Sequence, residues 1–73
     1  MLFRSRYHFA VALMRAGRPD EALKHASEGA TMEPASPRLH RVAGMAAGTL
    51  GLRVESFRHL SLARDLHDAS AAT

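Results

Sequence analysis

The chain has 73 residues, of which 47% are hydrophobic, and a formal net charge of +3. This length suits one domain or part of one, and the lack of cysteine excludes disulfides, thiolate zinc sites and cysteine nucleophiles. The ten lysines and arginines are interleaved with seven acids, which is typical of a solvated mixed surface and not of a nucleic-acid-binding stripe.

The first predicted helix covers residues 6–16. Apolar residues recur there at helical spacing, and Gly17 then supplies the left-handed C-cap that ends the helix. A second helix is predicted to begin at Pro19, because a proline's missing N–H costs nothing in a first turn. It continues to Glu33, and Pro34 closes it.

The third predicted helix starts with a strong local signal, since Ser36 suits the N-cap and Pro37 the first helical position. The helix continues to Leu50. Gly44 and Gly48 lie inside it and each costs about 1 kcal/mol relative to alanine. We therefore expect a neighbouring helix to approach closely at these two glycines.

The fourth predicted helix follows a turn at Gly51, which ends the third helix as Gly17 ends the first. It covers residues 54–69, and residues 70–73 are expected to be a frayed end. Its apolar residues at spacings of three predict one face made of Phe57, Leu60, Ala63 and Leu66.

The two halves of the chain are related by a fixed period. The numbers of Gly17 and Gly51 differ by 51 − 17 = 34. Identical residues recur at this offset in the pairs Ala12 and Ala46, Glu21 and Glu55, His25 and His59, and Ser27 and Ser61. Such a period marks stacked supersecondary units. The sequence predicts one all-α domain of two antiparallel helical hairpins, with repeat one at about 3–36 and repeat two at about 37–70.

These residues resemble the tetratricopeptide repeat family. The family motif W-x2-L-G-x2-Y corresponds to Arg6, Phe9, Ala10 and Leu13, and again to His40, Ala43, Gly44 and Ala47. The second-helix motif, A-x3-F followed by a small residue, falls on Ala22, Ala26 and Gly29, and again on Ser56, Leu60 and Ala63. The sequence departs from the family in having no tryptophan, and Asp68 stands where the closing proline of the second unit belongs.

The resemblance implies a fragment of a right-handed α-solenoid. Small residues such as Ala10, Ala22 and Gly29 would let the two helices of one hairpin approach closely. Because two hairpins leave an apolar face uncovered, we expect either neighbouring repeats of a longer array or self-association. The chain would then be a fragment of a longer protein.

The resemblance also implies a groove lined by the first helices of the two hairpins. Such a groove, apolar with a basic rim, suits a peptide or partner helix with an apolar anchor and an acidic flank. For Tyr7, Val11 and Met14 the sequence leaves a second interpretation open, namely that they form core between the hairpins. The groove residues by motif position are Tyr7, Val11, Met14, Arg15, Arg38, Arg41, Met45 and Thr49.

We therefore predict a protein-interaction scaffold and not an enzyme, with no cofactor and no metal. The sequence has no phosphate-cradling glycine loop, no G-x-S-x-G and no paired carboxylates on an apolar face. The sequence leaves open a second interpretation, in which this chain is the accessory repeat region of a larger enzyme. The longest charge-free apolar run of this chain, residues 42–52, is too short to cross a bilayer, so we expect a cytoplasmic protein without a membrane partner.

The alternative function is a basic helix-turn-helix-like module for nucleic acid. It would use Arg53, Arg58, His59 and Arg64 on the last helix, but apolar residues on the same helix weaken this hypothesis. We expect His25 and His59 to be solvated surface residues. His8 and His40 are expected nearer the helix interfaces.

Overall fold

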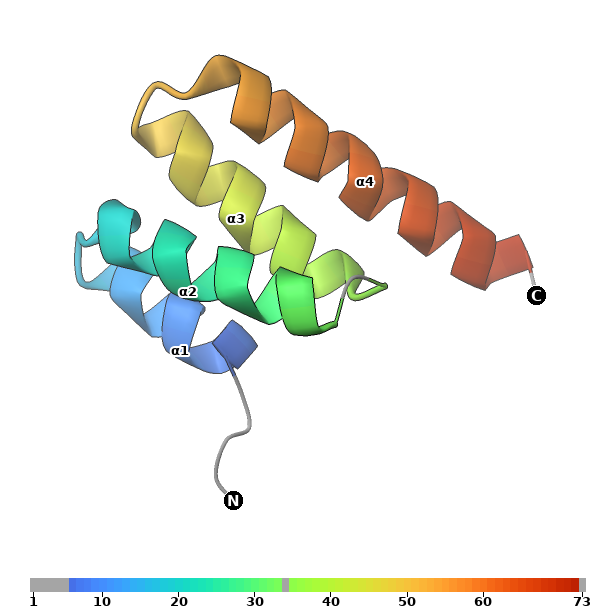
Figure 1. Cartoon of the computed structure of the whole chain (residues 1–73), viewed down its shortest axis with the longest axis horizontal. Coiled ribbons are helices and arrows are strands. Elements are labelled where there is room, and N and C mark those ends of the chain that lie inside the picture. The colour runs from blue at the N-terminus through green and yellow to red at the C-terminus, as the bar shows by residue number, and fades with distance from the viewer. Residues whose placement is uncertain (1–5, 34, 73) are drawn as a thin grey trace.

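The structure is a computed structural model that describes residues 6–33 and 35–72, with side chains described up to residue 67. This part of the chain contains no strand. Each helix packs against the next along the chain, and the first also contacts the third (Figure 1). The helices are α1 (Arg6–Arg15), α2 (Pro19–Met32), α3 (Pro37–Thr49) and α4 (Arg53–Ala72). The predicted all-α class is confirmed.

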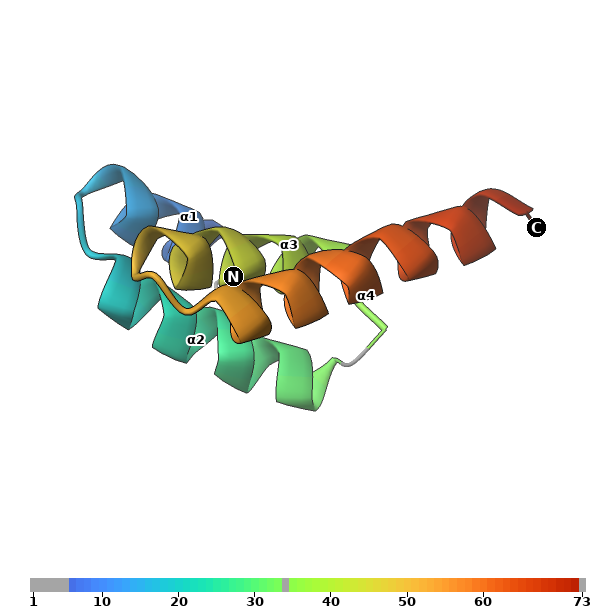
Figure 2. The same ribbon diagram turned by 90° about the horizontal axis from the view of Figure 1, so that it is seen from above.

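The helices form two helix–turn–helix pairs, α1 with α2 and α3 with α4. Figure 2 shows α1 and α3 on the same side of the molecule, above α2. The contact between α1 and α3 therefore joins the two pairs, and α3 is the central element because it touches all three other helices.

The two tight turns have the same backbone geometry. Gly17 and Gly51 both have positive φ, at 78° and 83°, which an L side chain rarely adopts. The hydrogen bonds around them repeat at the same offset as the sequence. The N–H groups of Gly17 and Arg18 donate to the carbonyls of Met14 and Leu13 at 3.1 and 2.8 Å, and those of Gly51 and Leu52 donate to Gly48 and Ala47 at the same two distances.

Local signals explain where the helices begin. Ser36 is the N-cap of α3, and its hydroxyl oxygen accepts a hydrogen bond from the Leu39 N–H at 3.3 Å. Pro37 begins α3 and Pro19 begins α2, as the sequence predicts. Two acids, Asp20 and Glu21, lie in the first turn of α2, where they complement the positive helix end.

The helix ends differ slightly from the prediction. The helices α1, α2 and α3 each end one residue earlier than expected, and Pro34 lies outside the described residues. By contrast, α4 continues to Ala72, which is 72 − 69 = 3 residues beyond the predicted end, where a frayed segment was expected. Two of these three residues are alanines, the strongest helix formers, so the helix continues.

Alanine forms the fully buried part of the core. No larger side chain among the described residues is completely inaccessible, whereas six alanines are 0% exposed. Alanine at helix contacts allows the helix backbones to approach closely, as the sequence predicts. The six are Ala10, Ala22, Ala26, Ala43, Ala46 and Ala47.

Glycine provides the closest approach, where α4 crosses α3. A β-carbon on Gly44 would lie 2.7 Å from Cγ of Leu60 and 3.2 Å from the backbone oxygen of Ser56. A β-carbon on Gly48 would lie 3.2 Å from Oγ of Ser56. The expected close approach of a neighbouring helix at both glycines is therefore confirmed.

The predicted apolar face of α4 is only partly buried. Ala63 is buried and Leu66 half-buried, but Leu60 is 41% and Phe57 75% exposed. A helix turns by about 100° per residue, so residues spaced by three drift steadily around the helix. Leu60 and Ala63 therefore face α3, where Leu60 packs over Gly44, and Phe57 is directed to solvent.

Candidate partner-binding face

The candidate face consists of the eight residues that the sequence analysis assigns to a groove. Its α3 members are all exposed in the structure, and Met45 is 52% exposed. Their spacings of three, four and four residues place them along one side of the helix. These members are Arg38, Arg41, Met45 and Thr49.

The α1 members of the candidate face lie at the junction of the two hairpins. Tyr7, Val11 and Met14 are half-buried and pack against a core cluster that includes Val42 of α3, whereas Arg15 is exposed. The first three residues thus pack between the hairpins and keep part of their surface in solvent.

A contact between Arg38 and Tyr7 connects the two helices of the candidate face. The guanidinium carbon of Arg38 lies 5.6 Å from the centroid of the Tyr7 ring, within the range of a cation–π interaction. At an exposed site such a contact contributes about 0.5–1 kcal/mol. It positions the Arg38 charge beside the α1–α3 junction.

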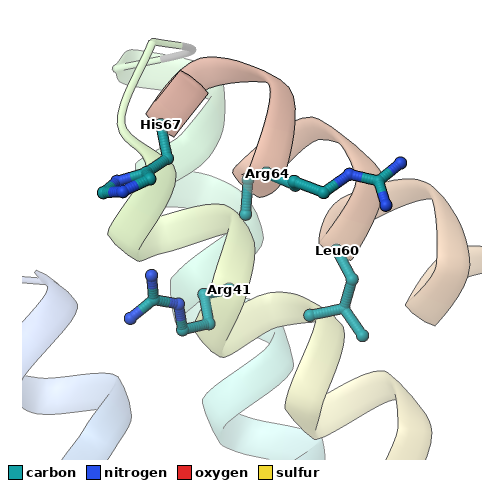
Figure 3. Close-up of a pocket in the computed structure, with 5 residues that line it drawn as sticks. Arg41, Leu60, Arg64 and His67 are labelled. Carbon is teal, nitrogen blue, oxygen red and sulfur yellow. The ribbon is translucent and has the colours of Figure 1, made fainter. Parts of the chain in front are cut away.

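Arg41 lies on the other edge of the candidate face, toward α4. It lines an open pocket of about 240 Å³ between α3 and α4 together with Leu60, Ala63, Arg64 and His67. In the view of Figure 3, Arg41 and His67 extend to one side of this pocket and Arg64 to the other. Sequence reasoning did not include Arg64 and His67 in the face. The period offered no signal for Arg64, because the residue one repeat earlier is Ala30 and not a charged residue.

The candidate face is positively charged. Neither α1 nor α3 contains an aspartate or glutamate, while Arg15, Arg38 and Arg41 are all exposed on these helices. On the neighbouring helix α2, Glu28 pairs with Arg6 of α1 at 3.3 Å. Any ligand of this face therefore meets an apolar surface beside arginines that no described acid neutralises.

Two histidines join α3 to α4 next to this face. His40 is 7% exposed, and its Nδ1 lies 3.1 Å from Nδ1 of His59, with the two rings stacked. The prediction that His59 is a solvated surface residue is therefore wrong, because its ring turns toward α3. His40 lies at an interface as expected, whereas His8 is exposed.

The pair holds one proton between two nitrogens. A hydrogen bond between two Nδ1 atoms needs one ring to donate an N–H and the other to accept it with a bare nitrogen. Burial, followed by the charge of His40, lowers the pKa of His59 below the usual 6.5; Arg58 lowers it further and Glu55 opposes the shift. Protonating the acceptor Nδ1 removes this acceptor and turns its N–H toward the N–H of the other ring, so the hydrogen bond is lost and a positive ring lies in a half-buried contact.

Stability is therefore expected to fall as the pH is lowered from 7.5 to 5. Because the pKa of His59 is lower in the fold, the unfolded chain binds the proton more readily, and the stabilising contribution is lost once the pH falls below 6.5. Thermal unfolding followed by circular dichroism measures this. The variant His59→Gln should show a smaller loss between the two pH values, whereas His67→Gln, at an exposed histidine of the same helix, should keep the wild-type loss. Equal pH dependence in His59→Gln and the wild type would contradict the assignment.

No other chemical site appears in the described residues. No group of three or more histidines, aspartates or glutamates converges there to hold a metal ion, and no described helix is long and apolar enough to span a membrane. No family model matches the sequence, and comparisons with curated proteins and with solved structures gave no significant match. The case for a function therefore depends on the chain's own residues and geometry.

Proposed function

We propose that this chain is a protein-interaction scaffold built from two tetratricopeptide-like hairpins. Its candidate face, on α1 and α3, binds a peptide or partner helix that carries an apolar anchor and acidic residues. The repeated turn at Gly17 and Gly51 supports the tetratricopeptide-like repeat, because the same two hydrogen bonds recur at the period typical of that family.

One observation carries the functional part of this proposal. The exposed stripe of α3 lies beside the α1–α3 junction, and half-exposed Met45 follows Arg38 and Arg41 along the same side of the helix. An apolar side chain among unneutralised cations matches a ligand with an apolar anchor and an acidic flank.

A selection from a displayed library of random 12-residue peptides tests this proposal. We expect enrichment of sequences that combine acidic residues with one large apolar residue. For a selected peptide, Met45→Glu should raise the Kd about tenfold or more, because it removes the anchor site and repels the acids. Lys24→Glu, on exposed α2 outside the face, changes the charge even more and should leave the Kd within about twofold. Equal effects of the two variants, or no enrichment, would overturn the proposal.

The structure gives no specific support to the nucleic-acid alternative. Of its four residues, Arg53, Arg58 and Arg64 are exposed, but His59 turns toward α3. The same helix exposes apolar side chains such as Val54 and Phe57, which are 72% and 75% exposed and would be poor neighbours for phosphates. A steep linear loss of DNA affinity with log salt concentration would instead favour this alternative.

A further inference from the structure

The first hairpin shows how this fold covers its apolar face. Ala10 of α1 and Ala26 of α2 are 0% exposed, because α3 lies over them and contributes Val42 and Ala43 to the same cluster. Around this cluster, larger apolar residues of α1 and α2 are half-buried by the same packing; they include Val11 and Leu23.

The second hairpin has the same face, but nothing in the described part of the chain covers it. Adding 34 to Ala26, Val11 and Leu23 gives Leu60, Met45 and Phe57. These three are 41%, 52% and 75% exposed, whereas their counterparts are fully or half buried. We call the apolar residues Met45, Phe57 and Leu60, together with Arg41, Arg64 and His67, the open face.

The open face differs from its counterpart in charge. At the positions of Tyr7 and Ala30 in the first hairpin, the second hairpin has Arg41 and Arg64. Both arginines line the pocket between α3 and α4 with His67, and its lining includes no acid among the residues whose side chains are described (Figure 3). A helix without acids, such as α3, would leave these cations beside an apolar interface without compensation, which costs free energy.

We propose that the open face is the docking site of an amphipathic helix whose apolar stripe is flanked by glutamate or aspartate. This inference rests on the proposed scaffold function and extends it to a surface that shares Arg41 and Met45 with the candidate face and continues onto α4. The partner helix would lie across α3 and α4 as α3 lies across α1 and α2. Its stripe, at spacings of three and four residues, would cover Met45, Phe57 and Leu60, while its acids would pair with Arg41 and Arg64.

A second copy of this chain fits the open face less well. In a second copy, the helix that corresponds to α3 is α1, the first helix of the other hairpin, which exposes the apolar Phe9 at 51%. However, α1 has arginines at both ends and no acid, so it would bring Arg6 and Arg15 toward Arg41 and Arg64. Like charges across an interface weaken association, and the acidic helix is therefore the better occupant.

Two designed peptides test this inference directly. Both carry the same leucine stripe at helical spacing on a 16-residue alanine-rich helix, with four flanking glutamates in one and four flanking lysines in the other. Fluorescence anisotropy with the full chain should show that the glutamate peptide binds at least about tenfold more tightly than the lysine peptide, and that this preference shrinks with added salt.

Variants that belong to only one surface separate this inference from the proposed function. Arg64→Glu/His67→Glu changes only the open face, at two exposed positions, and should reverse the preference toward the lysine peptide. A reversal cannot result from misfolding. Arg15→Glu/Arg38→Glu changes only the candidate face on α1 and α3 and should leave binding of the glutamate peptide within about twofold.

Three results would overturn the inference. The first is no binding of the glutamate peptide, and the second is binding that Arg15→Glu/Arg38→Glu abolishes and Arg64→Glu/His67→Glu does not. That second result leaves the proposed function standing. The third is concentration-dependent dimerisation in sedimentation that Phe57→Ser removes, since a second copy would then occupy the open face.

Discussion

Replacing Ala26 by leucine is expected to lower the free energy of unfolding by about 3 kcal/mol, at the upper end of what overpacking costs. Ala26 is 0% exposed and is enclosed by Ala10 of α1 and by Val42 and Ala43 of α3. A leucine at this position fits only if both α1 and α3 move away from α2. The melting temperature of a domain of this size should fall by roughly 12–24 °C, at about 4–8 °C per kcal/mol.

The matched control is the same substitution at an exposed alanine. Ala12→Leu on α1 adds the same atoms at a solvent-facing position and should change stability by less than about 0.5 kcal/mol. The double variant Ala10→Gly/Ala26→Leu makes room on α1 but not on α3, so it should recover only part of the loss. Full recovery, or a harmless Ala26→Leu, would show that α3 does not cover this site as the structure places it.

The second large effect is expected at Gly44, where alanine should destabilise the fold by up to about 2 kcal/mol, the net of overpacking and helix propensity. Its β-carbon would lie 2.7 Å from Cγ of Leu60, so the neighbouring helix must shift. Overpacking costs about 1–3 kcal/mol, and the gain in helix propensity returns about 1 kcal/mol of this. Thermal or denaturant unfolding measures the difference.

A double-mutant cycle isolates the cause. In the Leu60→Ala background, Gly44→Ala should cost nothing, because this pair reproduces the Ala10 and Ala26 pair of the first hairpin. Gly48→Ala is the control on the same helix. Its β-carbon would meet only the side chain of Ser56, whose hydroxyl can rotate away, so the variant should be neutral or more stable by up to about 1 kcal/mol. A destabilisation by Gly44→Ala that persists without the Leu60 side chain would contradict the proposed clash.

These two predictions concern equivalent positions of the two hairpins, since Gly44 and Leu60 lie 34 residues after Ala10 and Ala26. In the first hairpin, alanines at positions 10 and 26 leave room for α3 to pack over them. In the second hairpin, Gly44 makes room for Leu60, which remains 41% exposed. The larger side chain is accommodated because no described helix lies above it. The same difference leaves the apolar part of the open face available to a partner.

The sequence by itself determined the four described helices, the first residues of α1, α2 and α3, and both tight turns. These features follow from interactions within a few residues: the Ser36 cap, the prolines at 19 and 37, and the two glycines with positive φ. The internal period of 34 residues also predicted that each half of the chain forms one helical hairpin. Close packing at Gly44 also followed, since a helix rarely contains such glycines without a neighbour that requires them.

Only the tertiary structure decided which surfaces are covered. Residues one repeat apart, such as Ala26 and Leu60, have the same local signals, yet burial depends on whether a further helix lies over them. In the same way, His59 looked solvated along the chain but meets His40 across the α3–α4 contact. The open face has the same origin, because α3 covers the first hairpin and no described element covers the second.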